Sequence, residues 1–154
     1  MVQLGFRKPT NKWSQGGALG VEYFKVGANA TAAKMLAGTV VMKDTVDYCI
    51  KESDASGNDY GVLGYDETPD AYRPTTSTTA YAVGDIVAVH RGAGRRQKCR
   101  LTTAQTIVNG QPLKVTTDGL LTAATVGTDD VFADADESVT TTSAVAYIWV
   151  ITRK

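Results

Sequence analysis

The stretch "YAVGDIVAVHRGAGRRQKCRL", residues 81–101, surrounds a short glycine loop with the single histidine of the sequence, one of its two cysteines and a cluster of basic residues. Such a loop can cradle a phosphate, but a phosphate-binding loop leads into a helix whose N-terminus faces the anion. Here both flanks have the pattern of strands, and neither GxxxxGKS/T nor GxGxxG is present. We therefore expect a β-hairpin, in which Gly92 and Gly94 tolerate positive φ.

The period of two along these flanks indicates which residues face inward. In "YAVGDIVAVH" both faces are largely apolar, which predicts a central strand. In "RRQKCRL" the inward face is expected to hold Gln97, Cys99 and Leu101. The opposite face forms a basic ridge, consisting of Arg96, Lys98 and Arg100. His90 has no nucleophile motif beside it and no second histidine at metal spacing, so we expect a structural role for it.

Further strands are expected on both sides of this stretch. "VVMKDTVDYCIKE" predicts a half-buried strand with Val46, Tyr48 and Ile50 on one face, and "YGVLGYD" predicts a short strand after a turn. Residues 66–79, with two prolines and a Thr/Ser run, predict an exposed loop. Asp118-Gly119 between two apolar segments predicts a type I′ hairpin. "SAVAYIWVITRK" is apolar on both faces and predicts a buried closing strand.

The sequence divides into two regions of different composition. Residues 1–37 are rich in Gly and Ala with scattered aromatics, which favours an extended N-terminal arm over a plain strand and loop of the same domain. Residues 38–154 are expected to form an all-β domain, a small β-sandwich or barrel. The aromatic anchors expected on the arm are Phe6, Trp13, Tyr23 and Phe24.

Composition excludes several classes of partner. With 16 basic and 16 acidic residues, no global attraction to nucleic acid or to an anionic membrane is expected. No apolar run approaches the length of a membrane span, and the N-terminus lacks the apolar stretch of a signal peptide, so synthesis in a cytoplasm without export by that route is expected. The two cysteines show no zinc or disulfide spacing. We expect no metal and no cofactor.

The order of the motifs is informative. "GTVVMKDTVDYCIKESDASGNDYGVLGYDETP", then "AYAVGDIVAVHRGAG", then "NGQPLKVTTDGLLTAAT" resembles the capsid decoration, or head cement, proteins of tailed bacterial and archaeal viruses. The resemblance covers roughly residues 38–125. It implies a non-enzymatic protein on the outer capsid surface of the virion, bound to the major capsid protein and to itself, commonly as a trimer, that stabilises contacts between capsomers against the pressure of packaged DNA.

On this interpretation, the contact residues would be the four aromatic anchors and the basic ridge. Ordinary core packing is the alternative for the aromatics, and a solvated strand face is the alternative for the ridge. The basic ridge and the acidic segment "TDDVFADADES" can also meet within one chain, or across a subunit contact. The long N-terminal region departs from the more compact family members, which leaves the mode of contact open.

Two other functions remain open. The chain can be another virion module, such as a tail, baseplate or glycan-binding protein, for which an exposed Tyr72 on the 66–79 loop would be favourable. It can also be an enzyme that uses paired carboxylates, although no nucleophile or metal constellation supports catalysis. The carboxylates considered for this role are Asp66, Glu67, Asp134 and Asp136.

Overall fold

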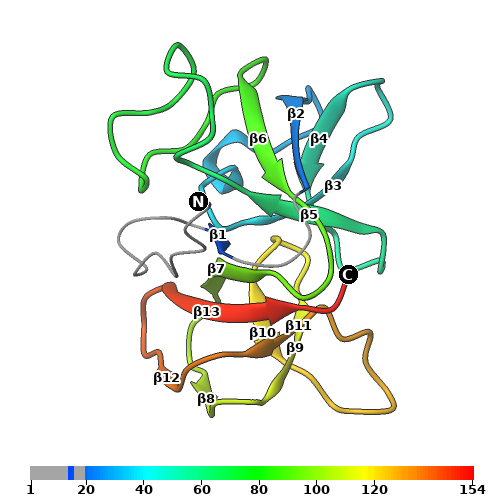
Figure 1. Cartoon of the computed structure of the whole chain (residues 1–154), viewed down its shortest axis with the longest axis vertical. Helices are drawn as coiled ribbons and strands as arrows, with labels where there is room; N and C mark the ends of the chain where they lie inside the picture. Colours follow the sequence, from blue (N-terminus) through cyan, green and yellow to red (C-terminus); the bar gives the residue numbers. More distant parts are fainter. Residues whose placement is uncertain (1–13, 16–19) are drawn as a thin grey trace, which may run out of the picture.

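The computed structural model describes residues 14–15 and 20–154, and this part of the chain is all-β, which confirms the predicted fold class. Its strands form two barrels, one stacked on the other, and the chain ends near the junction between them (Figure 1). Within the described residues, the helical content is a 3₁₀ turn, η1 (Ala32–Lys34). No helix there is long and apolar enough to cross a bilayer.

The first barrel, at the top of Figure 1, closes in the order β2-β4-β3-β5-β6. Its strands are β2 (Val21–Val26), β3 (Val40–Lys43), β4 (Cys49–Glu52), β5 (Asp59–Leu63) and β6 (Ile86–His90). β2 completes the ring, because it pairs antiparallel with β6 and parallel with β4. Met35, Ile50 and Tyr81 are among the large side chains buried in its core.

The second barrel is a ring in which pairing runs from β7 to β10, β9, β11 and β13 and returns to β7. Its strands are β7 (Arg96–Leu101), β9 (Pro112–Val115), β10 (Leu121–Ala123), β11 (Ala133–Ala135) and β13 (Ala146–Thr152). Outside the ring, β1 (Ser14–Gln15) pairs with β7, and β8 (Thr106–Ile107) pairs with β12 (Val139–Thr140). Ring closure pairs the edges that an open sheet would expose.

The predicted hairpin over residues 81–101 is wrong, although both of its strands exist. β6 pairs with β2 and β5, whereas β7 pairs with β1, β10 and β13, so the two strands belong to different barrels. Gly92 and Gly94 do have positive φ, at 111° and 76°, and they turn the chain from one barrel into the next. The Thr152 hydroxyl donates to the Gly92 carbonyl at 2.6 Å, and Gly94 N–H donates to the Thr152 carbonyl at 2.7 Å. The loop is therefore the link between barrels, fastened to the end of β13.

Residues 20–37, expected to be the second half of an arm, belong to the first barrel. β2 is one of its strands, and η1 leads to Met35, whose side chain is completely buried. Tyr81 N–H donates to the Met35 carbonyl at 2.8 Å, which ties this segment to the chain just before β6. Residues 1–13 and 16–19, including Phe6 and Trp13, lie outside the described residues.

The segment "VVMKDTVDYCIKE" forms two strands, not one. β3 and β4 make an antiparallel hairpin in which Asp44 N–H donates to the Cys49 carbonyl at 2.9 Å. Val46 and Tyr48 lie in the connecting turn and are 54% and 80% exposed, so they do not share a buried face with Ile50. The alternation of residues 46–50 is therefore not that of a strand.

The junction between the barrels is tight and partly apolar. Val40 and Val62, from the first barrel, are buried in the same cluster as the core of the second. Val40 N–H donates to the Gly119 carbonyl at 2.8 Å, and Arg100 N–H donates to the Gly38 carbonyl at 3.0 Å. A hydrophobic core that continues across two rings stabilises their relative position.

The β9–β10 hairpin brings Gly119 into this junction. Its strands pair as predicted, but Asp118 is not among the residues with positive φ, so the turn is not type I′. Gly119 N–H donates to the Thr116 carbonyl at 3.1 Å, and Gly119 itself has φ 70°. A Cβ on Gly119 would lie 2.4 Å from the Val40 carbonyl oxygen. Both the backbone conformation and the space therefore require glycine at this position.

We expect Gly119→Ala to lower the free energy of unfolding by about 2–4 kcal/mol, because a methyl group must push the barrels apart in addition to straining the turn. The matched control is Gly110→Ala, where φ is +86° but no atom lies within 4 Å of the added Cβ, so a loss of about 1 kcal/mol is expected. Urea denaturation of both variants measures the difference. Equal losses would show that the junction does not constrain Gly119.

Candidate functional site

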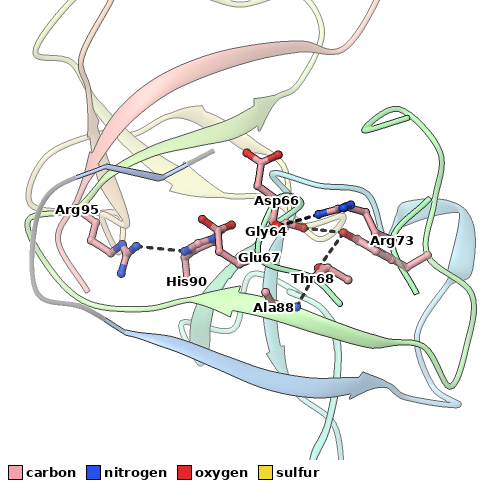
Figure 2. Close-up of polar contacts among 9 residues, drawn as sticks. Gly64, Asp66, Glu67, Thr68, Arg73, Ala88, His90 and Arg95 are labelled. Atoms are coloured by element: carbon pink, nitrogen blue, oxygen red, sulfur yellow. Dashed lines mark hydrogen bonds and ion pairs between the residues drawn. The ribbon is translucent and has the colours of Figure 1, made fainter. Parts of the chain in front are cut away.

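A buried polar cluster lies where the chain passes between the barrels. His90 is the last residue of β6, Glu67 lies on the loop that follows β5, and Arg95 immediately precedes β7 (Figure 2). The His90 side chain is completely buried, and Arg95 is 5% exposed. The Glu67 side chain keeps 28% of its surface exposed. The cluster therefore joins both barrels and one loop around a single imidazole.

The hydrogen bonds define the tautomer of His90. An Arg95 Nη2 lies 3.2 Å from Nδ1, and because a guanidinium can only donate, Nδ1 is the acceptor. Nε2 therefore carries the proton and donates to Glu67 Oε2 at 3.1 Å. In this arrangement the imidazole is neutral and separates an anion from a cation. A second proton on His90 would place two cations side by side in a buried site.

The loop that supplies Glu67 is pinned against β6. Thr68 Oγ1 accepts from Ala88 N–H at 3.1 Å, and the Tyr81 hydroxyl donates to the Gly64 carbonyl at 2.8 Å. A Cβ on Gly64 would lie 2.5 Å from His90 Nε2, so the ring packs directly on the backbone (Figure 2). Burial raises the pKa of Tyr81 to about 12. The predicted exposed loop is thus anchored at both of its ends.

The chemistry available to this cluster is structural. Both His90 nitrogens have partners, so neither is placed to take a proton from a serine or cysteine nucleophile. The Cys99 thiol is completely buried and its pKa is raised by desolvation, which makes it a poor nucleophile. Within residues 14–15 and 20–154, no group of three or more His, Cys, Asp or Glu side chains is arranged to hold a metal ion.

Three of the four carboxylates considered for catalysis have a basic side chain as hydrogen-bond partner. Asp134 receives two hydrogen bonds from Arg153, at 2.7 and 2.6 Å, and Asp136 accepts from Arg96 Nε at 2.5 Å. Asp66 and Glu67 belong to a loop of the first barrel, whereas Asp134 lies in β11 of the second. Asp134 and Asp136 are thus paired with arginines on the second barrel, and Glu67 is paired with His90.

The basic ridge lies on β7 as predicted, since Gln97, Cys99 and Leu101 alternate with it and are buried. Its three members have different surroundings. Arg96 stacks over Trp149 at 4.5 Å, and Lys98 Nζ lies 5.3 Å from the centre of the Tyr147 ring. Arg100 Nη1 donates to Thr39 Oγ1 at 3.3 Å, and desolvation lowers the pKa of its guanidinium. Arg100 therefore belongs to the junction between the barrels.

We call Arg96, Lys98, Tyr147 and Trp149 the cationic–aromatic face. The sequence indicates a buried closing strand at residues 145–151, but only one of its two faces is fully buried: Ile148 and Val150 point into the core, and the aromatic residues are half-buried outside. Antiparallel pairing places Trp149 opposite Lys98. In the sequence, both faces of this strand are apolar, so alternation alone does not show which face is buried.

The acidic segment and the basic residues meet within one chain. In addition to the Asp136–Arg96 pair, Asp129 accepts from Lys114 at 2.9 Å, and Asp130 contacts Lys154. Of the basic ridge, Arg96 meets the acidic segment within the chain, whereas the other two pairs use Lys114 and Lys154, which lie outside the ridge. Each of these pairs neutralises charge locally.

The two described aromatic anchors lie on β2 of the first barrel. Tyr23 is 55% exposed. Phe24 packs edge-on against Tyr60, with ring centres 5.3 Å apart, and against the core of the first barrel. Phe24 is therefore a packing residue, whereas Tyr23 remains available at the surface.

No protein-family model and no curated protein matches the chain. Among solved structures, the chain is similar to the N-terminal base of the head fiber protein gp8.5 of bacteriophage phi29, with 17% sequence identity and a TM-score of 0.47. The likeness covers 87% of this chain and 96% of that chain.

We expect His90→Ala to lower the free energy of unfolding by about 2–4 kcal/mol, because it leaves a cavity and removes one hydrogen bond each from Arg95 and Glu67. Chemical denaturation monitored by tryptophan fluorescence measures this loss. A loss below about 0.5 kcal/mol, typical of a surface substitution, would contradict a buried link between the barrels.

The raised pKa of Tyr81 predicts a loss of stability at high pH. Because the folded-state pKa is about 12 and the unfolded value is near 10, the buried phenol contributes its full stability below pH 10 and loses it as the pH rises through 12. The total amounts to about 3 kcal/mol. In Tyr81→Phe this component is absent, so the stability advantage of the wild type should shrink between pH 9 and pH 11.5. A constant difference would contradict the assigned burial.

Proposed function

We propose that this chain is a non-enzymatic structural protein of a virus head, which binds the outer surface of the expanded capsid and strengthens contacts between capsomers. The resemblance over residues 38–125 supports this family of functions. The observation that carries the proposal is the cationic–aromatic face on β7 and β13. Trp, Tyr and Arg are the residue types that most often dominate binding energy at protein interfaces.

The construction of the molecule suits a mechanical role. Two closed rings share a buried junction, and the link between them is fastened to the C-terminal strand. Such a body transmits force from one contact to another without large internal motion. The pairing of acidic and basic side chains within the chain also lets many copies lie close together without strong repulsion.

We further propose that the protein acts as a homotrimer whose main partner is the major capsid protein. Repeated, symmetric contacts allow weak individual sites to give strong attachment. Residues 1–13, with Phe6 and Trp13, precede β1, which pairs with β7 beside the cationic–aromatic face. We propose that these residues contribute to the same contact as the cationic–aromatic face.

Co-sedimentation with expanded, undecorated capsids of the virus that encodes the chain tests this function. Wild-type protein should bind saturably, at one trimer for each local three-fold position. Lys98→Glu and Trp149→Ala should each weaken binding by about tenfold, which corresponds to about 1.4 kcal/mol. The matched control is Lys25→Glu, an exposed lysine on β2 of the other barrel, which should bind as the wild type does.

A deletion of residues 1–13 tests the N-terminal contribution and leaves β1 and β2 intact. Weaker binding by this variant, with an unchanged melting temperature, would support a contact made by these residues. No sedimentation of the wild-type protein with capsids would contradict a decoration role and favour a tail or baseplate module. Equal binding by Lys98→Glu and Lys25→Glu would exclude the cationic–aromatic face as the contact.

A further inference from the structure

An open groove of about 580 Å³ lies on the first barrel, away from the cationic–aromatic face. Its walls come from β2, from the turn between β3 and β4, and from Tyr60 on β5. Tyr23 and Tyr48 line it together with Val46. These three side chains are among the large hydrophobic residues that the described surface exposes, at 55%, 80% and 54%. Exposed aromatic side chains that gather in one concave site indicate binding.

The backbone at Tyr48 supports the same conclusion. Cys49 N–H donates to the Val46 carbonyl at 3.2 Å, so Tyr48 is the third residue of a four-residue turn. Its φ is +60°, a conformation that suits Gly or Asn and disfavours a bulky residue. The side chain of Tyr48 contributes little packing energy to the fold, because most of it faces solvent. Strain at an exposed aromatic residue is typical of a functional position.

Three of the four charged side chains that line the groove have partners within the chain. Glu22 accepts from Arg91 at 3.1 Å and from the Tyr60 hydroxyl, and these partners hold its pKa below the usual range. Lys43 Nζ lies 4.8 Å from the centre of the Tyr60 ring. Asp44 is another lining carboxylate, and it accepts from Asn29 Nδ2 at 2.8 Å. Asp47 is the remaining lining carboxylate. Because the partners of Glu22 and Asp44 hold those two carboxylates in place, the groove offers ordered polar groups beside its aromatic rings.

We propose that this groove binds a neutral carbohydrate. A sugar ring has a face of C–H groups that packs on an aromatic ring, and hydroxyls around its edge that exchange hydrogen bonds with carboxylates and tyrosine hydroxyls. Tyr23 and Tyr48 supply the rings, and Glu22 and Asp47 supply acceptors at the groove wall. An aliphatic peptide would lack partners for these polar groups, and burying them unpaired is unfavourable.

Saturation-transfer difference NMR with chitohexaose, cellohexaose and maltohexaose tests the proposal on the full chain. At least one of these oligosaccharides should receive saturation from the wild-type protein. Tyr48→Asn should weaken that binding by about tenfold or more, the loss expected for one stacking contact. Its melting temperature should equal or exceed that of the wild type, because Asn relieves the positive φ. Tyr72→Ser, at an exposed tyrosine outside the groove, is the matched control and should bind as the wild type does.

Three results would overturn the proposal. The first is the absence of saturation transfer to all three oligosaccharides. The second is equal binding by Tyr48→Asn and the wild type. The third is a change of oligomeric state or of capsid binding in Tyr48→Asn with no effect on oligosaccharides, which would make the groove a protein contact. Capsid attachment is tested on the other barrel, so either function can fail while the other stands.

Discussion

The carbonyl oxygen of Val40 approaches Gly119 so closely that no side chain fits between them, and this contact sets how the two barrels sit. Around it, Val40 and Val62 join the core of the second barrel, and Arg100 N–H reaches the Gly38 carbonyl. On the other side of the link, neutral His90 holds Arg95 and Glu67 together. Each barrel is small, and burial of surface between them adds to a core that a single ring of short strands could barely provide.

This junction gives the molecule two surfaces with different chemistry on one rigid body. The cationic–aromatic face belongs to the second barrel, and the tyrosine-lined groove belongs to the first. Neither surface depends on the polar cluster at the link, whose side chains bind one another. A division of this kind suits a protein that attaches by one barrel and presents the other. The His90 imidazole serves the fold because it is buried and both of its nitrogens have partners.

Much of the secondary structure could be predicted from local patterns, because strands such as β7 and β13 have a clear period of two. The pairing of these strands could not, because nothing local shows that Val89 and Cys99 are buried in different cores. Gly92 and Gly94 allow a hairpin and a link between barrels equally well. For the same reason, the sequence predicts an arm where β2 lies: five of its six residues pair with β6 without being fully buried, and only Val26 at its end is buried.

The candidate surfaces were harder to predict than the fold. The basic ridge follows from alternation, but its division between Arg96 at the surface and Arg100 at the junction depends on contacts with Thr39 that are distant in sequence. The turn at residues 44–48 has the alternation of a strand in sequence. Its positive φ and the exposure of Tyr48 appear only in the folded structure. Contacts between distant segments, which a single sequence does not record, decide both cases.

A cryo-electron microscopy reconstruction of virions that carry this chain would show whether it lies on the capsid and which barrel makes the contact. We expect density for two stacked barrels above the capsid shell at local three-fold positions, with the β7 and β13 side of the second barrel against the shell and the first barrel pointing outward. Density for the chain at the tail or baseplate, or a capsid contact made through the first barrel, would contradict this expectation.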